Sequence, residues 1–141
     1  MNIVCFYGLE DILIRFAFLC GAAKEGFQQK KFSQMHERLL SEGYLEREIT
    51  LFANGVSELM LECALNGAFD SEADEIFLYF CAESIKKGSD TFFLRDEEIR
   101  FDVISYYESL AKKIGSVFRV VYDCDDEMVC EDALGWERVA Q

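Results

Sequence analysis

Proline is absent from the 141 residues, and histidine occurs only once, as His36. The absence of proline removes the usual breaker of helix interiors and the slow isomerisation of X-Pro bonds. A single histidine also excludes a zinc site of the HExxH type, because Leu40 stands where a motif beginning at His36 needs its second histidine. We therefore interpret His36 as a surface or boundary side chain.

The six cysteines form no CxxC pair, and no second histidine is present to complete a tetrahedral metal site. The N-terminal apolar run contains Glu10, Asp11 and Arg15, so it does not resemble a secretion signal, and no run approaches the ~18 uncharged apolar residues of a membrane span. We expect reduced thiols in the cytoplasm, most of them as small core residues, and no association with membranes.

Motifs for ions and nucleotides are incomplete. Asp123, Asp125 and Glu127 alternate like the first ligands of a calcium loop, but Met128 and Leu134 replace the glycine and glutamate that such a loop requires. The nine glycines are scattered and form no phosphate-binding loop. We therefore predict no metal, no cofactor and no enzymatic activity; a small enzyme that uses paired carboxylates remains an alternative.

Acidic residues are abundant and unevenly placed. Asp and Glu total 27 against 14 Lys and Arg, a formal net charge of -13. Residues 1–66 hold 9 acids and 6 bases (net -3), whereas residues 67–141 hold 18 acids and 8 bases (net -10). Such a field repels nucleic acid and attracts a basic surface, so the expected partner is a basic protein.

Apolar residues at intervals of three and four predict five helices. Residues 1–7 are either a buried strand or the start of the first helix. Ser71 and Asp74 resemble the capping box of the fourth helix, and Gly43, Gly88 and Gly115 provide helix ends. The predicted helices span residues 9–25, 32–42, 45–66, 72–87 and 103–114.

Two short strands joined by a four-residue loop are predicted within residues 91–102, and a third at 117–122 with a possible return through 127–130. We expect these segments to form a small antiparallel sheet. The sequence therefore predicts an α+β fold, a mainly helical single domain over residues 1–141 with a small antiparallel sheet in its C-terminal half. The alternative is an all-α fold with an irregular C-terminal segment.

The C-terminal half of the sequence contains three acidic clusters, at residues 70–75, 96–98 and 123–132, and Trp136 lies just after the last of them. The acids after the 117–122 strand are expected to be exposed, and tryptophan is enriched at interface hot spots. The predicted partner-binding residues are Asp70, Glu72, Asp74, Glu75, Asp96, Glu97, Glu98, Asp123, Asp125, Asp126, Glu127, Glu131, Asp132 and Trp136.

These properties favour an inhibitory binding protein that neutralises a basic partner. Negative charge, one small domain and no catalytic set are typical of an immunity protein, or antitoxin, that blocks a bacterial nuclease toxin. A phage-type DNA mimic that inhibits CRISPR or restriction enzymes is the alternative, and it would need carboxylates in a long regular stripe. The oligomeric state is not predicted.

Overall fold

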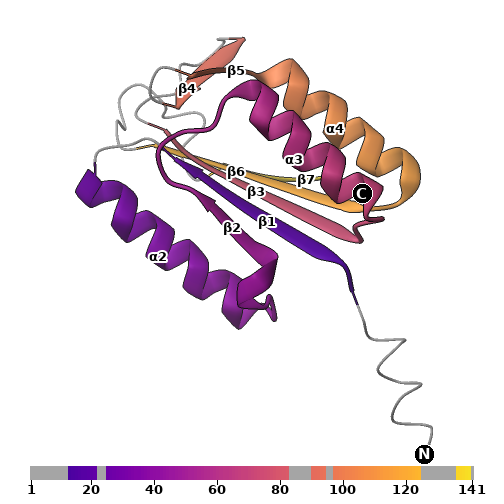
Figure 1. Cartoon of the computed structure of the whole chain (residues 1–141), viewed down its shortest axis with the longest axis horizontal. Coiled ribbons are helices and arrows are strands. Elements are labelled where there is room, and N and C mark those ends of the chain that lie inside the picture. The colour runs from indigo at the N-terminus through magenta and orange to yellow at the C-terminus, as the bar shows by residue number, and fades with distance from the viewer. Residues whose placement is uncertain (1–12, 22–24, 83–89, 95–96, 125–135, 141) are drawn as a thin grey trace, which may run out of the picture.

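A five-stranded sheet organises the chain (Figure 1). The computed structural model describes residues 13–21, 25–82, 90–94, 97–124 and 136–140. The strand order is β2-β1-β3-β6-β7; the first four strands are parallel, and only β7 runs antiparallel. The strands are β1 (Arg15–Gly21), β2 (Ile49–Phe52), β3 (Glu75–Ala82), β6 (Val117–Cys124) and β7 (Trp136–Ala140).

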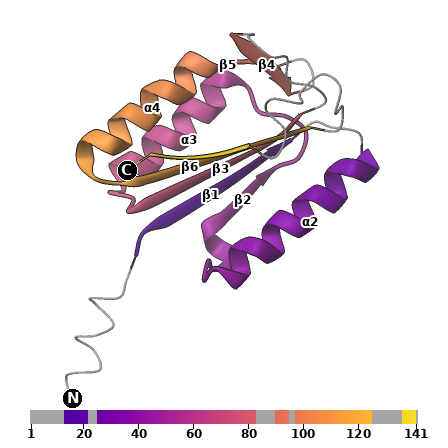
Figure 2. The ribbon, with the colours of Figure 1, turned by 180° about the vertical axis from the view of Figure 1, so that it is seen from behind.

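Helices cover both faces of the sheet (Figures 1 and 2). Helix α2 (Glu25–Ser41) lies on one face, and α3 (Glu58–Asp70) and α4 (Phe101–Ile114) lie side by side on the other. A short 3₁₀ turn, η1 (Glu46–Glu48), leads into β2. The strands β4 (Thr91–Leu94) and β5 (Glu97–Arg100) form a separate antiparallel hairpin between β3 and α4.

Side chains alternate between the two layers along each central strand. In β3, Ile76, Leu78 and Phe80 join the core beneath α3 and α4, whereas Phe77 and Tyr79 join the core beneath α2. All of these side chains are buried. Strands covered on both faces have few polar positions, which is why these segments read as continuous apolar runs.

The predicted fold class is wrong. The protein is α/β with four parallel strands, not a mainly helical domain with a small antiparallel sheet. The predicted strand at 117–122 does exist as β6, but it pairs in parallel with β3. The predicted hairpin within 91–102 also exists, as β4 and β5, but it forms its own two-stranded sheet, and two residues rather than the predicted four separate its strands. The possible return through 127–130 lies outside the described residues.

Two predicted helices are strands. The segment predicted as a helix over 9–25 contains β1, and the one over 72–87 contains β3. In both strands nearly every residue is apolar, so apolar residues also occur three and four positions apart, as they would in a helix. The Ser71 and Asp74 signal does not begin a helix; Ser71 ends α3, and the Asp74 carboxylate instead accepts a hydrogen bond from the Ile14 backbone, 2.8 Å away.

The predicted helix over 45–66 is divided in two. Its first part forms η1 and β2, and only its second part is helical, as α3. Gly55, within the predicted helix, has a φ of 88° and lies in the connection between β2 and α3. The helix predicted over 103–114 is confirmed by α4, and the one over 32–42 corresponds to α2, which begins seven residues earlier than predicted. Gly43 and Gly115 follow these helices with positive φ.

Candidate functional site

The acids of residues 70–75 lie in the turn between α3 and β3, at the amino end of the sheet. Asp70 and Glu72 are exposed. Asp74, also exposed, binds the Ile14 amide at the start of β1, and Glu75 accepts a hydrogen bond from the Tyr44 hydroxyl. Asp74 and Glu75 therefore make structural contacts with other parts of the fold. Asp70 and Glu72 are the two exposed acids of this turn that are available to a partner.

The hairpin carries the second acidic group. Glu97 and Glu98 are exposed on β5, and the Phe93 side chain, which lies directly across from Glu98, is 51% exposed. The inner face of the hairpin is anchored by buried Phe92, whose ring lies 4.9 Å from that of Phe80. Leu94 and Ile99 are buried beside it. The outer face of this anchored hairpin thus presents the Phe93 ring beside the Glu98 carboxylate.

An ion pair fastens the base of this hairpin to α3. The Arg100 guanidinium donates to both carboxylate oxygens of Glu58, with Nη2 2.8 Å from Oε1. The bond from Arg100 lowers the pKa of Glu58, and Glu58 raises the pKa of Arg100. Because the positive charge of Arg100 is paired with Glu58, Arg100 does not neutralise Glu97 or Glu98.

The two described acidic groups lie at opposite ends of the molecule. Residues 70–75 precede β3 and the hairpin follows it, so the eight residues of β3 separate them by roughly 26 Å at 3.3 Å per residue. Along α3, Glu58 and Asp70 are about 18 Å apart at 1.5 Å per residue. The acids at 70–75 and 97–98 therefore do not form one patch.

Asp123 is buried, contrary to the prediction. It was expected to be exposed, but only 8% of its surface is accessible. The Lys31 ammonium lies 3.0 Å from its carboxylate, and the Tyr79 hydroxyl donates to the same oxygen at 3.1 Å. Burial, the nearby Cys81 and the charge of Asp123 raise the pKa of Tyr79, so this hydroxyl stays protonated as a donor. Asp123 is thus a structural carboxylate on the α2 face of β6.

The remaining predicted residues are described only in part. Trp136 begins β7, where its backbone is paired with Tyr122. Among the described cysteines, Cys20 and Cys81 are buried and Cys63 is exposed, and burial raises the pKa of the Cys20 thiol. The predicted acids that lie outside the described residues are Asp96, Asp125, Asp126, Glu127, Glu131 and Asp132.

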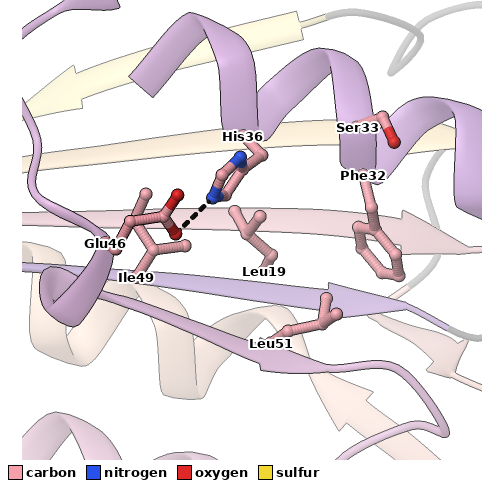
Figure 3. Close-up of a pocket in the computed structure, with 7 residues that line it drawn as sticks. All are labelled: Leu19, Phe32, Ser33, His36, Glu46, Ile49 and Leu51. Atoms are coloured by element: carbon pink, nitrogen blue, oxygen red, sulfur yellow. Dashed lines mark hydrogen bonds and ion pairs between the residues drawn. The ribbon is translucent and has the colours of Figure 1, made fainter. Parts of the chain in front are cut away.

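A pocket that the sequence did not indicate lies between α2 and the edge strand β2 (Figure 3). Its volume is about 340 Å³. Apolar side chains from β1, β2 and α2 line it, with Ser33, His36 and Glu46 as its polar members. His36 Nε2 lies 2.8 Å from Glu46 Oε1, which joins α2 to η1. The lining residues are Leu19, Phe32, Ser33, His36, Glu46, Ile49 and Leu51.

Phe93 and the pocket residues were both missed. The alternation of Phe92, Phe93 and Leu94 in a strand would have placed Phe93 on the outer face of the hairpin. The pocket had no comparable signal, since its residues come from four elements whose arrangement was predicted incorrectly.

Comparisons with known proteins identify no relative: no family model, no curated protein and no solved structure matches the chain. Among the described residues, no group of three or more His, Cys, Asp or Glu side chains is arranged to hold a metal ion. None of the described helices is both long enough and apolar enough to cross a membrane.

Proposed function

We propose that this chain is an acidic, non-catalytic binding protein of the cytoplasm that neutralises a basic protein partner. The form we favour is an immunity protein that covers a bacterial nuclease toxin domain. The observation that carries the proposal is the hairpin, whose inner face is anchored in the core and whose outer face places exposed Phe93 directly across from exposed Glu98. Glu97, the next exposed acid, is the cross-strand partner of Leu94. Aromatic residues, including Phe, are enriched in protein interfaces, whose rims are polar, and complementary charge there mainly raises the association rate.

The charge of this segment supports the same surface. Residues 90–102 contain five acids and two bases, a net charge of -3, and the described Asp90, Glu97, Glu98 and Asp102 are all exposed. Arg100 is paired with Glu58. The hairpin therefore presents negative charge to a cationic partner, which would accelerate their encounter at low salt.

The arrangement of the described acids favours a local binding patch over the long row of carboxylates that a DNA mimic requires. Imitation of a phosphate backbone needs carboxylates in a long regular row, with one charge per ~1.7 Å of duplex axis. The described groups at 70–75 and 97–98 are instead separated by the length of β3. A protein partner of matching shape requires only one of them.

The test is capture of the partner, with toxin protection as its functional measure. We expect the captured protein to be basic and its enzymatic activity to be inhibited. Phe93→Ala should weaken binding by about 2 kcal/mol if Phe93 is a hot spot. Glu97→Gln and Glu98→Gln together should mainly slow association, as rim charges do. Asp70→Asn, at the other end of the molecule, is the matched control.

Three results would argue against the proposal. An acidic partner would contradict the electrostatic argument. Equal affinity in the Phe93 and Asp70 variants would remove the hairpin from the interface. Capture of a CRISPR or restriction enzyme in place of a toxin would instead favour a DNA mimic.

A further inference from the structure

The edge of the sheet at β2 is the least protected border of the described fold. Among the described strands, β2 pairs only with β1. Its sequence, Ile-Thr-Leu-Phe, contains neither a charged residue nor a proline, which in other proteins prevent unwanted pairing at a sheet edge. The short length of β2 is therefore its main protection against such pairing. Leu51 is 52% exposed there. The outer backbone groups of β2 can therefore accept another extended segment.

Hydrogen bonds connect α2 to the chain near each end of β2, and the stretch of α2 between these two bonds faces the pocket. Near the end of β2, Gln28 Nε2 donates to the Ala53 carbonyl at 2.8 Å, and near its start His36 bonds to Glu46 at 2.8 Å. Gln28 and His36 are about 12 Å apart along the helix. Four residues of extended chain span ~13 Å, so the open stretch matches the length of β2.

The pocket occupies this open stretch, as Figure 3 shows. Ile49 and Leu51 line it, whereas Phe52, on the opposite face of β2, packs against Phe18 in the other layer. A volume of about 340 Å³ is at the lower limit for ligand sites, which suits one or two apolar side chains. The pocket is therefore placed to receive a side chain from a strand added to β2.

Charge indicates what should accompany that apolar side chain. Glu46 is the only Asp, Glu, Lys or Arg among the residues that line the pocket, and its side chain is 73% exposed. One oxygen bonds to His36, and the exposed carboxylate can accept a further hydrogen bond from a cation. Glu37, the next acid along α2, is exposed but does not line the pocket.

We propose that β2 and this pocket bind an extended peptide segment of a partner protein by strand addition. The segment places an apolar side chain in the pocket and a basic side chain two residues away against Glu46. Residues two apart in a strand point to the same face, so both reach the α2 layer. The preference for a basic residue rests on the proposed function, whereas the edge and pocket stand independently of it.

The probe is the blocked pentapeptide Thr-Leu-Thr-Lys-Thr, titrated into the full chain and followed by amide NMR shifts. We expect affinity of roughly millimolar order, with shifts centred on Thr50, Leu51 and Ser33. The isomer Thr-Leu-Lys-Thr-Thr has the same composition but directs leucine and lysine to opposite faces, so it should bind at least tenfold more weakly. N-methylation of the amides that face β2 should abolish binding.

Paired protein variants test each component. Ser33→Trp should fill the pocket and weaken binding at least tenfold, whereas Gln34→Trp, at the next exposed position of α2, should not. Glu46→Gln should weaken binding about threefold at low salt, in contrast to Glu37→Gln, which should have little effect. Equal binding by the two peptide isomers, or by the Ser33 and Gln34 variants, would overturn the proposal.

Other occupants and other sites give distinct results. If Phe93→Ala with Glu97→Gln and Glu98→Gln abolishes peptide binding, the peptide binds the hairpin; this inference then fails while the proposed function stands. If the peptide binds only after deletion of residues 1–12, the chain's own N-terminal segment is the occupant. If the protein is a dimer that Thr50→Pro dissociates, the occupant is a second copy. Either result overturns the proposal of a partner segment.

Discussion

The carboxylate of Asp123 lies in an unusual setting for so acidic a protein. It is buried at the carboxyl end of β6, with Lys31 from α2 and the Tyr79 hydroxyl from β3 as its partners. A buried charge is tolerated only when it is paired and hydrogen-bonded. These contacts therefore join one helix and two strands on the α2 face.

Asp123→Asn should destabilise the fold by about 1–3 kcal/mol, because it removes the charge that Lys31 and Tyr79 bind. We expect less than the ~3–5 kcal/mol of a fully buried pair, since the Lys31 side chain is 31% exposed. Urea denaturation at pH 7 measures the change. Glu97→Gln on the hairpin is the control, with an expected effect below ~0.5 kcal/mol. Equal effects of the two substitutions would show that Asp123 has no structural role.

At the scale of elements, ion pairs connect the end of α2 with β6. Arg119 Nη1 lies 3.0 Å from Glu42, and Arg38 Nε lies 3.1 Å from the same carboxylate. Burial alone would raise the pKa of Glu42, but the bonds and charges of Arg119 and Arg38 outweigh it and lower that pKa below 4.5. Glu42 therefore links α2 to the sheet most strongly in its ionised form.

Glu42→Gln should reduce the free energy of unfolding at neutral pH by less than about 1 kcal/mol, since the pair is partly exposed. A folded pKa below the unfolded value means that this contribution is fully present above pH 4.5 and is lost as the pH falls through the folded pKa. The variant and the parent should thus converge in acid. Denaturation at pH 7 and pH 3 measures this, with Glu37→Gln as control. A constant difference at both values would contradict the linkage.

The elements also show what the sequence could predict. The α2 and α4 segments were recognised because each exposes one side to water and alternates polar with apolar residues at helical spacing. The β4 and β5 hairpin was recognised in part, because its polar and apolar positions alternate: Phe92 and Ile99 face the core while Phe93 and Glu98 face outward. Its second strand was placed too late, since β5 begins at Glu97, within the predicted four-residue loop. Local patterning suffices where one face of an element is solvated.

Elements covered on both faces were predicted incorrectly. Every residue from Ile76 to Ala82 is buried, so no polar position reveals the period of β3. Parallel pairing between β1 and β3 also joins residues about 60 apart, which no local pattern reports. The same gap hid the proposed peptide site, because the β2 edge and its pocket depend on the sheet order. Asp123 was predicted to be exposed because its neighbours in the sequence are acidic, but it is buried.

At the scale of the whole molecule, net charge opposes folding while it favours a basic partner. A charge of -13 on 141 residues creates repulsion among exposed carboxylates. Pairs such as Glu58 with Arg100 offset part of it, but acids outnumber bases by 27 to 14. We therefore expect the free protein to be less stable at low salt than its packing alone would allow.

Sodium chloride should raise the melting temperature of the isolated protein. Between 0.01 M and 0.1 M salt the Debye length falls from about 30 to 10 Å, which screens repulsion between distant carboxylates. A gain of ~1 kcal/mol would correspond to about 4 °C for a chain of this size. Calorimetry at the two concentrations checks it. Chloride is preferable to sulfate, because sulfate also stabilises folded proteins through exclusion from their surface.

A charge-reduced variant separates this repulsion from other effects of salt. Asp70→Asn, Glu97→Gln and Glu98→Gln together lower the net charge from -13 to -10 at exposed positions. The variant should melt at a higher temperature than the parent in 0.01 M salt and gain less on the addition of salt. If salt instead lowers the melting temperature of both proteins, then attractive pairs such as those of Glu42 and Glu58 outweigh the repulsion, and the acidic surface does not reduce the stability of the fold.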